Sequence, residues 1–464
     1  MADRKTLSFF RYARPMAAMS MILAVPLTAS AMAAVESGTR AELARFMDVF
    51  QEVKANYVEP VDDSRLVEGA IEGMLASLDP HSGYLDARDF ATLRTQTDGE
   101  YGGLGLSVTM EDGAVKVIAP QADTPADRAG IKAGDFITHI DGELILGFTL
   151  DEAVEKMRGV PGTSIRLTVV RPGRDEPIQA NITREVIVLK PVTWKVEGSV
   201  GVLELSGFSE NAASELRAAM IAVERSLGRK PTGWILDMRS NPGGLLDQAV
   251  AVSDLFLERG EIVSQRGRRP GDIERFNARP GDAAGGLPVI VLIDSGSASA
   301  SEIVAGALQD HHRGLVMGET SFGKGSVQTV LPLSDTTALR LTTARYFTPS
   351  GRSVQEGGII PDIRVPQISD PDYRTRPVFR EADLRRHLVN DARINDAGLE
   401  DDGVNDPRFS QTPEQLREQG IEDFQLHYAT QTIARLARNP RLATDLARRP
   451  AAARAAARPV RANR

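Results

Sequence analysis

Two segments of the sequence bring together residue types that could carry out nucleophilic catalysis. The first, 294–302, reads D-S-G-S-A-S-A-S-E and follows the apolar run 289–293. A strand, a tight turn of small residues and a helix form the geometry that exposes a nucleophile, so Ser299 is the candidate. Because Ser299 and Glu302 also have the spacing of a helix capping box, a purely structural N-cap is the alternative interpretation.

A serine nucleophile needs a general base, usually histidine, but the histidines of this chain are poorly placed. His311 and His312 end the helix expected to follow Ser299, roughly 16 to 20 Å along its axis. Three others lie outside the segment expected to hold the site: His139, His387 and His427. His81, in the segment D-P-H-S at 79–82, is the remaining candidate among the histidines.

Lys324 is the stronger candidate for the base. It lies between two glycines in G-K-G at 323–325, after a predicted strand at 314–318. Glycines let the backbone approach closely and leave the ammonium group poorly solvated. To act near pH 7, Lys324 needs its pKa lowered from roughly 10.4 to near 7, a cost of about 4 kcal/mol that burial can supply. Gln328, on the same face of the following strand, would hold the amine without adding charge.

Two other motifs overlap Lys324, and each lacks a required feature. Gly318-x4-Gly323-Lys324 approaches the phosphate-binding P-loop, but position 325 is glycine instead of the Ser or Thr that binds Mg²⁺. The alternating pattern at 326–333 also predicts a strand where that motif needs a helix. Ser321-x-x-Lys324 has the spacing of penicillin-binding enzymes, which requires a helical turn that the flanking glycines disfavour.

Acyl transfer also needs hydrogen-bond donors for the oxyanion. The segment N-P-G-G, residues 241–244, follows a predicted strand and offers the N–H groups of Gly243 and Gly244. The N–H group of Ala300 lies beside the nucleophile at the start of the expected helix. A plain turn is the alternative interpretation of the two glycines.

The elements that must position these residues have the pattern of an α/β unit, placed at 192–365. Runs 234–236 and 289–293 are continuously apolar and each is followed by aspartate, as expected of strands covered on both faces. We therefore expect the functional loops at the ends of these strands.

Short β-type runs with glycine turns occupy 99–191. A helix start at 124, the pattern A-G-I-K-A-G-D at 129–135 and a capping box at 149–152 together resemble a PDZ module. This resemblance implies that the loop formed by Gly103, Leu104, Gly105 and Leu106 binds the terminal carboxylate of a peptide through its backbone N–H groups. A plain hairpin turn is the alternative.

Arg158 ends the second helix of this module, and two roles are open to it. A cation near the last carbonyl groups of a helix is a favourable cap. The alternative is regulatory: Arg158 lies at the edge of the expected peptide groove and would couple peptide binding to the order of the Ser299 and Lys324 loops.

The termini predict export and association. Residues 1–33 place four basic residues before the apolar run 16–27 and small residues after it, which is the layout of a signal peptide. A membrane anchor is the alternative, although it needs about 20 apolar residues and this run has about a dozen before Pro26. We expect a periplasmic protein.

In the N-terminal region 34–98, amphipathic helices are expected at 41–57 and 66–78, packed on another domain or a second subunit.

The remaining sequence narrows the function classes. Region 366–464 is expected to hold a helix at 424–436 and a disordered tail rich in Ala and Arg from 450. A net charge of -8 argues against nucleic acid as the main partner. With no cysteine, disulfides, thiol nucleophiles and Cys-ligated metals are excluded.

Taken together, the motifs resemble the carboxy-terminal processing peptidases, tail-specific serine proteases with a PDZ domain. The matching segments are S-A-S-A-S-E-I at 297–303, G-K-G-S-V-Q at 323–328, D-M-R-S-N-P-G-G at 237–244, Y-F-T-P-S-G-R at 346–352 and D-P-H-S at 79–82. The resemblance implies Ser299 as nucleophile, Lys324 as general base and Gln328 as the residue that positions it. It also implies a multidomain α/β fold, a protease core with an inserted PDZ-like domain and N-terminal helices.

The expected function is therefore an exported serine endopeptidase that uses a Ser/Lys dyad to cleave proteins near C-termini recognised by the PDZ domain. No metal or cofactor is expected. The expected partners are C-terminal tails of proteins, an adaptor protein and further copies of the chain. A catalytically silent scaffold that binds peptides through the same module is the alternative, although a scaffold would not need Ser299, Lys324 and Gln328 together.

Overall fold

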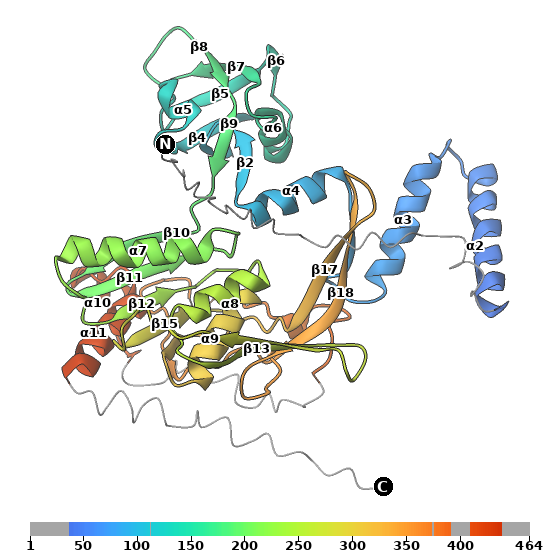
Figure 1. The fold of residues 1–464 in the computed structure, drawn as a ribbon. Coiled ribbons are helices and arrows are strands. Elements are labelled where there is room, and N and C mark those ends of the chain that lie inside the picture. The colour runs from blue at the N-terminus through green and yellow to red at the C-terminus, as the bar shows by residue number, and fades with distance from the viewer. Residues whose placement is uncertain (1–36, 112, 374, 391–408, 439–464) are drawn as a thin grey trace, which may run out of the picture. The chain divides into compact units, whose positions relative to one another are not determined.

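The computed structural model describes residues 37–111, 113–373, 375–390 and 409–438 (Figure 1). The chain divides into two compact units, residues 1–70 and 71–464. The helices α2 (Ser37–Asn56) and α3 (Asp63–Ala76) confirm the two predicted N-terminal helices. The predicted signal peptide and the Ala/Arg-rich tail lie outside the described residues. Within the described ranges, no helix has both the length and the apolar character needed to cross a membrane.

The PDZ-like segment forms a small antiparallel sheet with two short helices, α5 (Pro125–Arg128) and α6 (Leu150–Met157). Thr149 and Glu152 form the predicted capping box of α6. Alternate strand residues such as Val115 and Val117 are buried in one apolar cluster with Met157 of α6. The strands of this sheet follow in the order β3 (Leu106–Glu111), β4 (Ala114–Pro120), β5 (Phe136–Ile140), β7 (Ser164–Val170) and β8 (Ile178–Thr183). The short strand β6 (Glu143–Leu144) pairs with β5.

Two paired strands and a helix flank this segment in the sequence. They are α4 (Ala87–Asp98), β2 (Glu100–Gly103) and β9 (Glu185–Val188). Gly99 ends α4 in the left-handed conformation with φ 74°, which a glycine adopts without steric cost.

The protease-like segment is built on a six-stranded sheet in the order β10-β11-β12-β15-β16-β19. All neighbours are parallel except β10 with β11, which confirms the α/β expectation. The strands are β10 (Val192–Glu197), β11 (Val200–Leu205), β12 (Trp234–Asp237), β15 (Val289–Ile293), β16 (Leu315–Gly318) and β19 (Ile363–Arg364).

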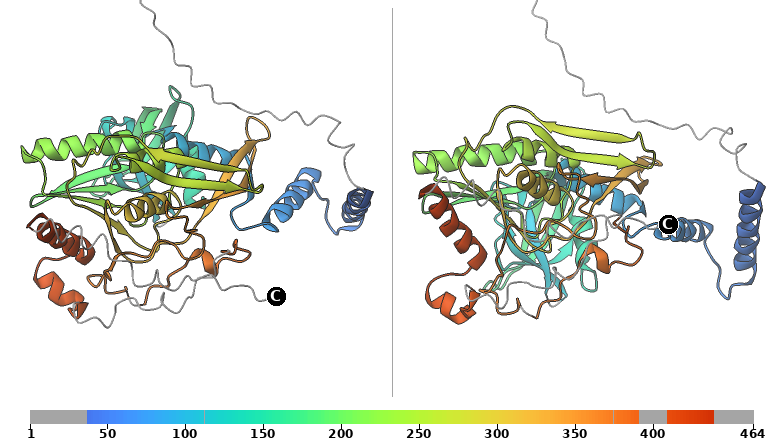
Figure 2. Two further views of the ribbon diagram at one scale, coloured as in Figure 1. Left: turned by 60° about the horizontal axis from the view of Figure 1, so that its bottom comes forward. Right: turned by 90° about the horizontal axis from the view of Figure 1, so that it is seen from below.

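Helices cover both faces of this sheet because successive strand residues point to opposite sides. Leu236 and Val291 are buried in a cluster with α7 (Ala212–Leu227), α8 (Leu246–Asp254) and α9 (Ala300–Asp310). Ile235 and Ile290 are buried in a second cluster with α11 (Phe424–Arg438), preceded by α10 (Pro413–Glu418). Figure 2 shows α11 in red and α7 in green on opposite sides of the sheet. The sequence predicts the helix of α11, but not that it completes the core.

A second sheet carries the residues after the Lys324 loop. Its strands are β1 (Gly83–Leu85), β13 (Gly260–Gly267), β14 (Ile273–Ala278), β17 (Ser326–Pro332) and β18 (Ala338–Phe347). Long β18 pairs with β17, β1 and β13, all antiparallel. A short 3₁₀ helix, η1 (Glu381–Asp383), follows later in the chain.

Candidate active site

Ser299 lies in the tight turn between β15 and α9, where the sequence predicts an exposed nucleophile. Its φ of 56° lies in the left-handed region, which is strained for a residue with a side chain. Strain of this kind is concentrated at functional sites. The Glu302 N–H donates to the carbonyl oxygen of Ser299 at 2.9 Å, and the Ser299 hydroxyl makes no capping hydrogen bond. The Glu302 side chain accepts the Ser299 N–H, as in the predicted capping box, whereas the Ser299 hydroxyl does not cap the helix.

The buried carboxylate of Glu302 joins the nucleophile turn to the lysine loop. Its Oε2 accepts the N–H groups of Ser299 at 2.7 Å and Lys324 at 3.0 Å. Its Oε1 accepts the Ser321 hydroxyl at 2.5 Å and the Gly323 N–H at 2.7 Å. The sequence assigns Glu302 only a capping position, so this role is a structural finding. The four hydrogen bonds favour the ionised form and lower the pKa of Glu302, but burial has the larger effect and raises this pKa to about 7.

Lys324 enters the site through this loop, and its surroundings favour the neutral amine. Burial lowers the pKa of Lys324 below its ordinary value, and the positive charge of Arg340 lowers it further. The carboxylates of Glu381, Glu302 and Asp79 oppose that shift. Across the described residues, Ser299 and Lys324 are held together by backbone bonds to Glu302 and not by a direct hydrogen bond between their side chains.

Tyr346, which the sequence analysis includes only as part of a motif, also contacts both residues. Its hydroxyl donates to the Lys324 carbonyl oxygen and lies within hydrogen-bonding reach of the Ser299 side chain. Burial and the nearby charge of Glu302 raise the pKa of Tyr346 well above its ordinary value, so the phenol stays protonated.

Gln328 lies on β17, opposite Thr342 of β18. Its Nε2 donates to Ser326 Oγ at 2.9 Å and to Thr342 Oγ1 at 3.2 Å. Both hydrogen bonds thus join Gln328 to hydroxyl groups of the second sheet rather than to the lysine amine.

The turn 241–244 lies directly against the nucleophile. A Cβ atom on Gly243 would lie 2.9 Å from Ser299 Cβ and 3.0 Å from the Ala300 nitrogen, so this position needs glycine. The Gly243 N–H donates to Asn241 Oδ1 at 2.9 Å, and its expected role as an oxyanion donor stays a prediction. Ala300 is the first residue of α9, where N–H groups have no partner within the helix. The N–H groups of Ala300 and Gly244 are the other candidates.

The histidine alternatives have other partners. His81 Nε2 lies 2.8 Å from Oε2 of the buried Glu381, and His311 Nε2 lies 2.7 Å from the Glu261 carbonyl oxygen. Neither ring nitrogen is directed to Ser299.

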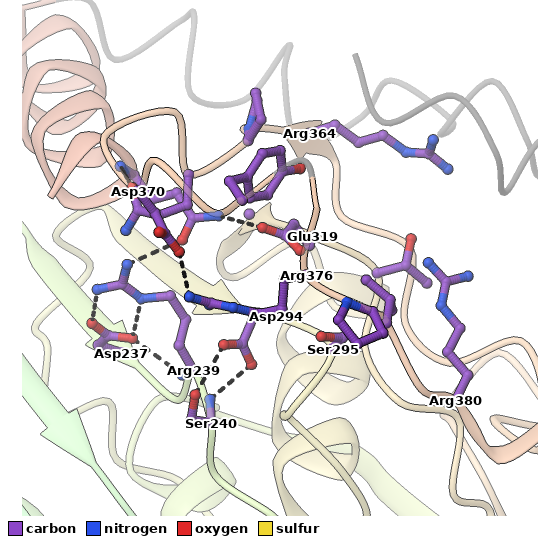
Figure 3. Close-up of a pocket in the computed structure, with 18 of the residues that line it drawn as sticks. Asp237, Arg239, Ser240, Asp294, Ser295, Glu319, Arg364, Asp370, Arg376 and Arg380 are labelled. Atoms are coloured by element: carbon purple, nitrogen blue, oxygen red, sulfur yellow. Dashed lines mark hydrogen bonds and ion pairs between the residues drawn. The ribbon is translucent and has the colours of Figure 1, made fainter. Parts of the chain in front are cut away.

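A charged pocket of about 1050 Å³ lies at the carboxyl ends of β12, β15 and β16 (Figure 3). Arg239 forms ion pairs with Asp237 and Asp423 there, and Asp294 accepts the Ser240 N–H at 2.7 Å. Ser299 and Lys324 do not line the pocket. Its hydrogen bonds instead tie together the turns that lead into 241–244 and 295–299.

The predicted carboxylate-binding loop is held by its carbonyl groups. The Leu104 oxygen accepts the Ala126 N–H at 2.9 Å, and the Gly105 oxygen accepts the Gln121 N–H at 2.8 Å. Because N–H and C=O point in opposite directions across a trans peptide, the N–H groups of Gly105 and Leu106 point away from those partners.

Arg158 does not cap α6 with its side chain. The Arg184 guanidinium takes that place, donating to the carbonyl oxygens of Met157 at 3.0 Å and Lys156 at 2.9 Å. The Arg158 guanidinium lies 4.7 Å from the centre of the Tyr101 ring, a cation–π distance. Its Nε is buried without a hydrogen-bond partner in the described part of the chain.

Three family models match this chain. They are peptidase family S41 at residues 199–365, the PDZ domain at 116–171 and the "Activating protease CtpB N-terminal domain" at 18–89.

Curated relatives extend over most of the sequence. A carboxy-terminal-processing protease of Bartonella bacilliformis is 53% identical over 355 residues, 76% of this chain and 82% of the relative. The carboxy-terminal processing protease CtpB of Bacillus subtilis is 37% identical over 355 residues, 75% of this chain and 72% of the relative. Among solved structures, the photosystem II D1 C-terminal processing protease is 28% identical, with a TM-score of 0.42, and covers 75% of this chain and 100% of its own.

Proposed function

Because this chain belongs to peptidase family S41, as a carboxy-terminal processing serine protease with a PDZ domain, we propose that Ser299 and Lys324 form its catalytic dyad. The observation that carries this proposal is the Glu302 carboxylate, whose Oε2 accepts the backbone N–H groups of both residues. The lowered pKa of the Lys324 amine supports its role as the base.

In the proposed reaction, Ser299 Oγ attacks the carbonyl carbon of the scissile peptide bond while the neutral Lys324 amine accepts its proton. Collapse of the tetrahedral intermediate breaks the C–N bond, and Lys324 returns the proton to the leaving amine. A water molecule, deprotonated by Lys324, then hydrolyses the acyl-enzyme and restores Ser299. Gln328 positions the amine during these steps.

The oxyanion of the tetrahedral intermediates would be stabilised by the N–H groups of Ala300 and Gly244. Gly243 would contribute by having no side chain, because a Cβ there would crowd Ser299 and the Ala300 nitrogen. Loss of one oxyanion donor typically costs about 3 kcal/mol of transition-state stabilisation.

Substrate tails would be recognised by the loop at Gly103, Leu104, Gly105 and Leu106. The carbonyl groups of Leu104 and Gly105 are engaged by the rest of the module, so the N–H groups of the same two peptide units, those of Gly105 and Leu106, point away from these contacts and would bind a terminal carboxylate. We further propose that Arg158, stacked on Tyr101, couples tail binding to the order of the Ser299 and Lys324 loops.

The proposed function also includes export of the protein from the cytoplasm. The layout of residues 1–33 supports secretion to the periplasm, where the enzyme would meet envelope proteins. An adaptor protein and further copies of the chain stay proposed partners.

Replacing Ser299 with alanine tests the dyad and the scaffold alternative together. We expect Ser299→Ala to keep the wild-type melting temperature and to lose cleavage, because no other hydroxyl takes the place of the nucleophile. The measurement incubates each purified protein with cell-envelope extract and sequences the new C-termini by mass spectrometry. Equal cleavage by wild type and Ser299→Ala would remove Ser299 as nucleophile, and no cleavage by wild type would favour the scaffold.

A further inference from the structure

The segment D-P-H-S at 79–82 has no part in the reaction described above, yet its aspartate is buried close to Lys324. Asp79 is 4% exposed, and its charge influences the lysine pKa. Its Oδ1 accepts the N–H groups of His81 at 2.9 Å and Ser82 at 2.8 Å, and its Oδ2 accepts the Ser82 hydroxyl at 2.8 Å. These bonds hold the carboxylate in one orientation.

A further hydrogen bond joins this carboxylate to the second sheet. Asp79 Oδ1 also accepts the hydroxyl of Thr342 on β18, at 3.1 Å. Burial raises the pKa of Asp79, but the hydrogen bonds from Ser82, His81 and Thr342 outweigh it and hold the pKa below its ordinary value. Asp79 is therefore an ionised group that can only accept hydrogen bonds.

A break in strand register places Thr342 opposite Gln328. Val327 pairs with Ala344, but the next residue, Gln328, pairs with Thr342, so β18 has one extra residue, Thr343. Such a bulge redirects side chains next to active sites. Gln328 Nε2 lies 3.2 Å from Thr342 Oγ1 as a result.

The direction of these hydrogen bonds determines how the Gln328 amide is turned. The Thr342 hydroxyl has one proton, which it donates to Asp79. Toward Gln328, the Thr342 oxygen can then act only as a hydrogen-bond acceptor. The amide nitrogen of Gln328, and not its amide oxygen, must therefore face Thr342. The second amide hydrogen is donated to Ser326 Oγ. The Oε1 atom has no hydrogen-bond partner among the described residues.

We propose that Thr342, oriented by Asp79, is a positioning residue that turns the Gln328 amide so that its Oε1 accepts a hydrogen bond from Lys324. This inference rests on the proposed function, because it gives the D-P-H-S segment a role in holding the general base. Within the described residues, Thr342 has no hydrogen bond to Ser299, and it would act only through Gln328.

A double-mutant cycle on Thr342 and Gln328 tests the inference in the full-length enzyme. Thr342→Val keeps the shape but removes the hydroxyl, and we expect kcat to fall roughly tenfold with KM unchanged, as for residues in one hydrogen-bond network. In the Gln328→Ala background, the same substitution should cause no further loss. Thr342→Ser retains the hydroxyl and should keep activity near wild type.

Two further variants make the cycle decisive. Thr343→Val is the matched control, because Thr343 is exposed and its hydroxyl bonds to Thr329 instead of Gln328. It should keep wild-type kcat. Thr342→Ala replaces Thr342→Val in the cycle if valine lowers the melting temperature, since alanine also lacks the acceptor.

Several results would overturn the inference. The first is a wild-type kcat in Thr342→Val. The second is a loss of kcat in Thr342→Ser as large as that in Thr342→Val. The third is the same fold-loss of kcat from Thr342→Val in the wild-type and Gln328→Ala backgrounds. Wild-type kcat in Gln328→Ala would overturn both this inference and the proposed role of Gln328. Failure of the dyad is recognised separately, by cleavage that survives in Ser299→Ala.

Discussion

As the proposed base, Lys324 can act only as a free amine, so its surroundings would decide the pH at which the enzyme works. Burial and the charge of Arg340 lower its pKa, while three nearby carboxylates limit the shift. The amine is protonated below this pKa and free above it. Each added positive charge near the amine should therefore extend activity to lower pH.

We expect kcat/KM to rise with pH through the lowered pKa of Lys324 and not to depend on chelators. Lys324→Ala should be inactive, and Lys324→Arg should not restore activity, because a guanidinium stays protonated at any working pH. The measurement is a pH profile of cleavage with and without EDTA. Activity that survives Lys324→Ala but disappears in His81→Ala would show that the dyad is wrong.

Because of Glu302, the stability of the protein should fall as the pH rises, whereas its activity should increase. Its pKa is about 7 in the folded protein against 4.5 as its reference value, so the folded state binds more protons between these values. The stability this group contributes is fully present below about pH 4.5 and is lost as pH rises through about 7.

We expect Glu302→Gln to remove this contribution, since glutamine does not titrate. Between pH 5 and pH 8, the free energy of unfolding of wild type should fall because Glu302 ionises. In the variant this fall should be smaller by roughly 2 to 3 kcal/mol. Urea unfolding at both pH values measures the difference. Identical pH dependence in the two proteins would show that Glu302 titrates near its reference pKa. Cleavage should also fall, because the amide cannot accept all four hydrogen bonds.

At the scale of elements, α6 ends beside two arginines with different contacts. Arg184 satisfies the last carbonyl groups of the helix, whereas Arg158 stacks on Tyr101. The capping role therefore belongs to Arg184, and the coupling role of Arg158 stays a proposal.

We expect Arg158→Ala to lower cleavage of a tail-bearing substrate severalfold with little change in melting temperature, because a coupling residue biases an equilibrium between two states. Arg184→Ala is the matched control and should lower the melting temperature, since it leaves two helix carbonyl groups without their partner. Unchanged cleavage by Arg158→Ala would remove the regulatory proposal.

At the scale of the whole molecule, the protease core is completed by residues more than 100 positions after Ser299. Helix α11 covers one face of the parallel sheet, and Ile433 is fully buried against it. A Cβ on Gly233 would lie 2.7 Å from Ile433 Cγ2, which shows how closely the helix packs.

We expect Ile433→Ala to lower the free energy of unfolding by about 2 to 4 kcal/mol through the cavity that it leaves. Arg435→Ala, exposed on the same helix, is the control and should change stability by less than about 0.5 kcal/mol. Equal stability of the two variants in urea unfolding would mean that α11 contributes little to the core.

The sequence by itself indicated several of the helices and strands and the identity of the candidate dyad. Apolar runs, caps and glycine turns act over a few residues, so β12, β15 and α6 lie where their patterns predict. The motif around Ser299 and the G-K-G segment are equally local. Their chemistry can be recognised before any folding is known.

Only the tertiary structure decided which groups meet. The Gly243 N–H is engaged by Asn241, Glu302 joins two loops, and Arg184 replaces Arg158 as the cap of α6. Local patterns do not specify these partners, because each hydrogen bond depends on which distant segment packs beside the group and on which donors and acceptors are already satisfied. The same holds for Thr342, whose place opposite Gln328 follows from a single bulge in β18.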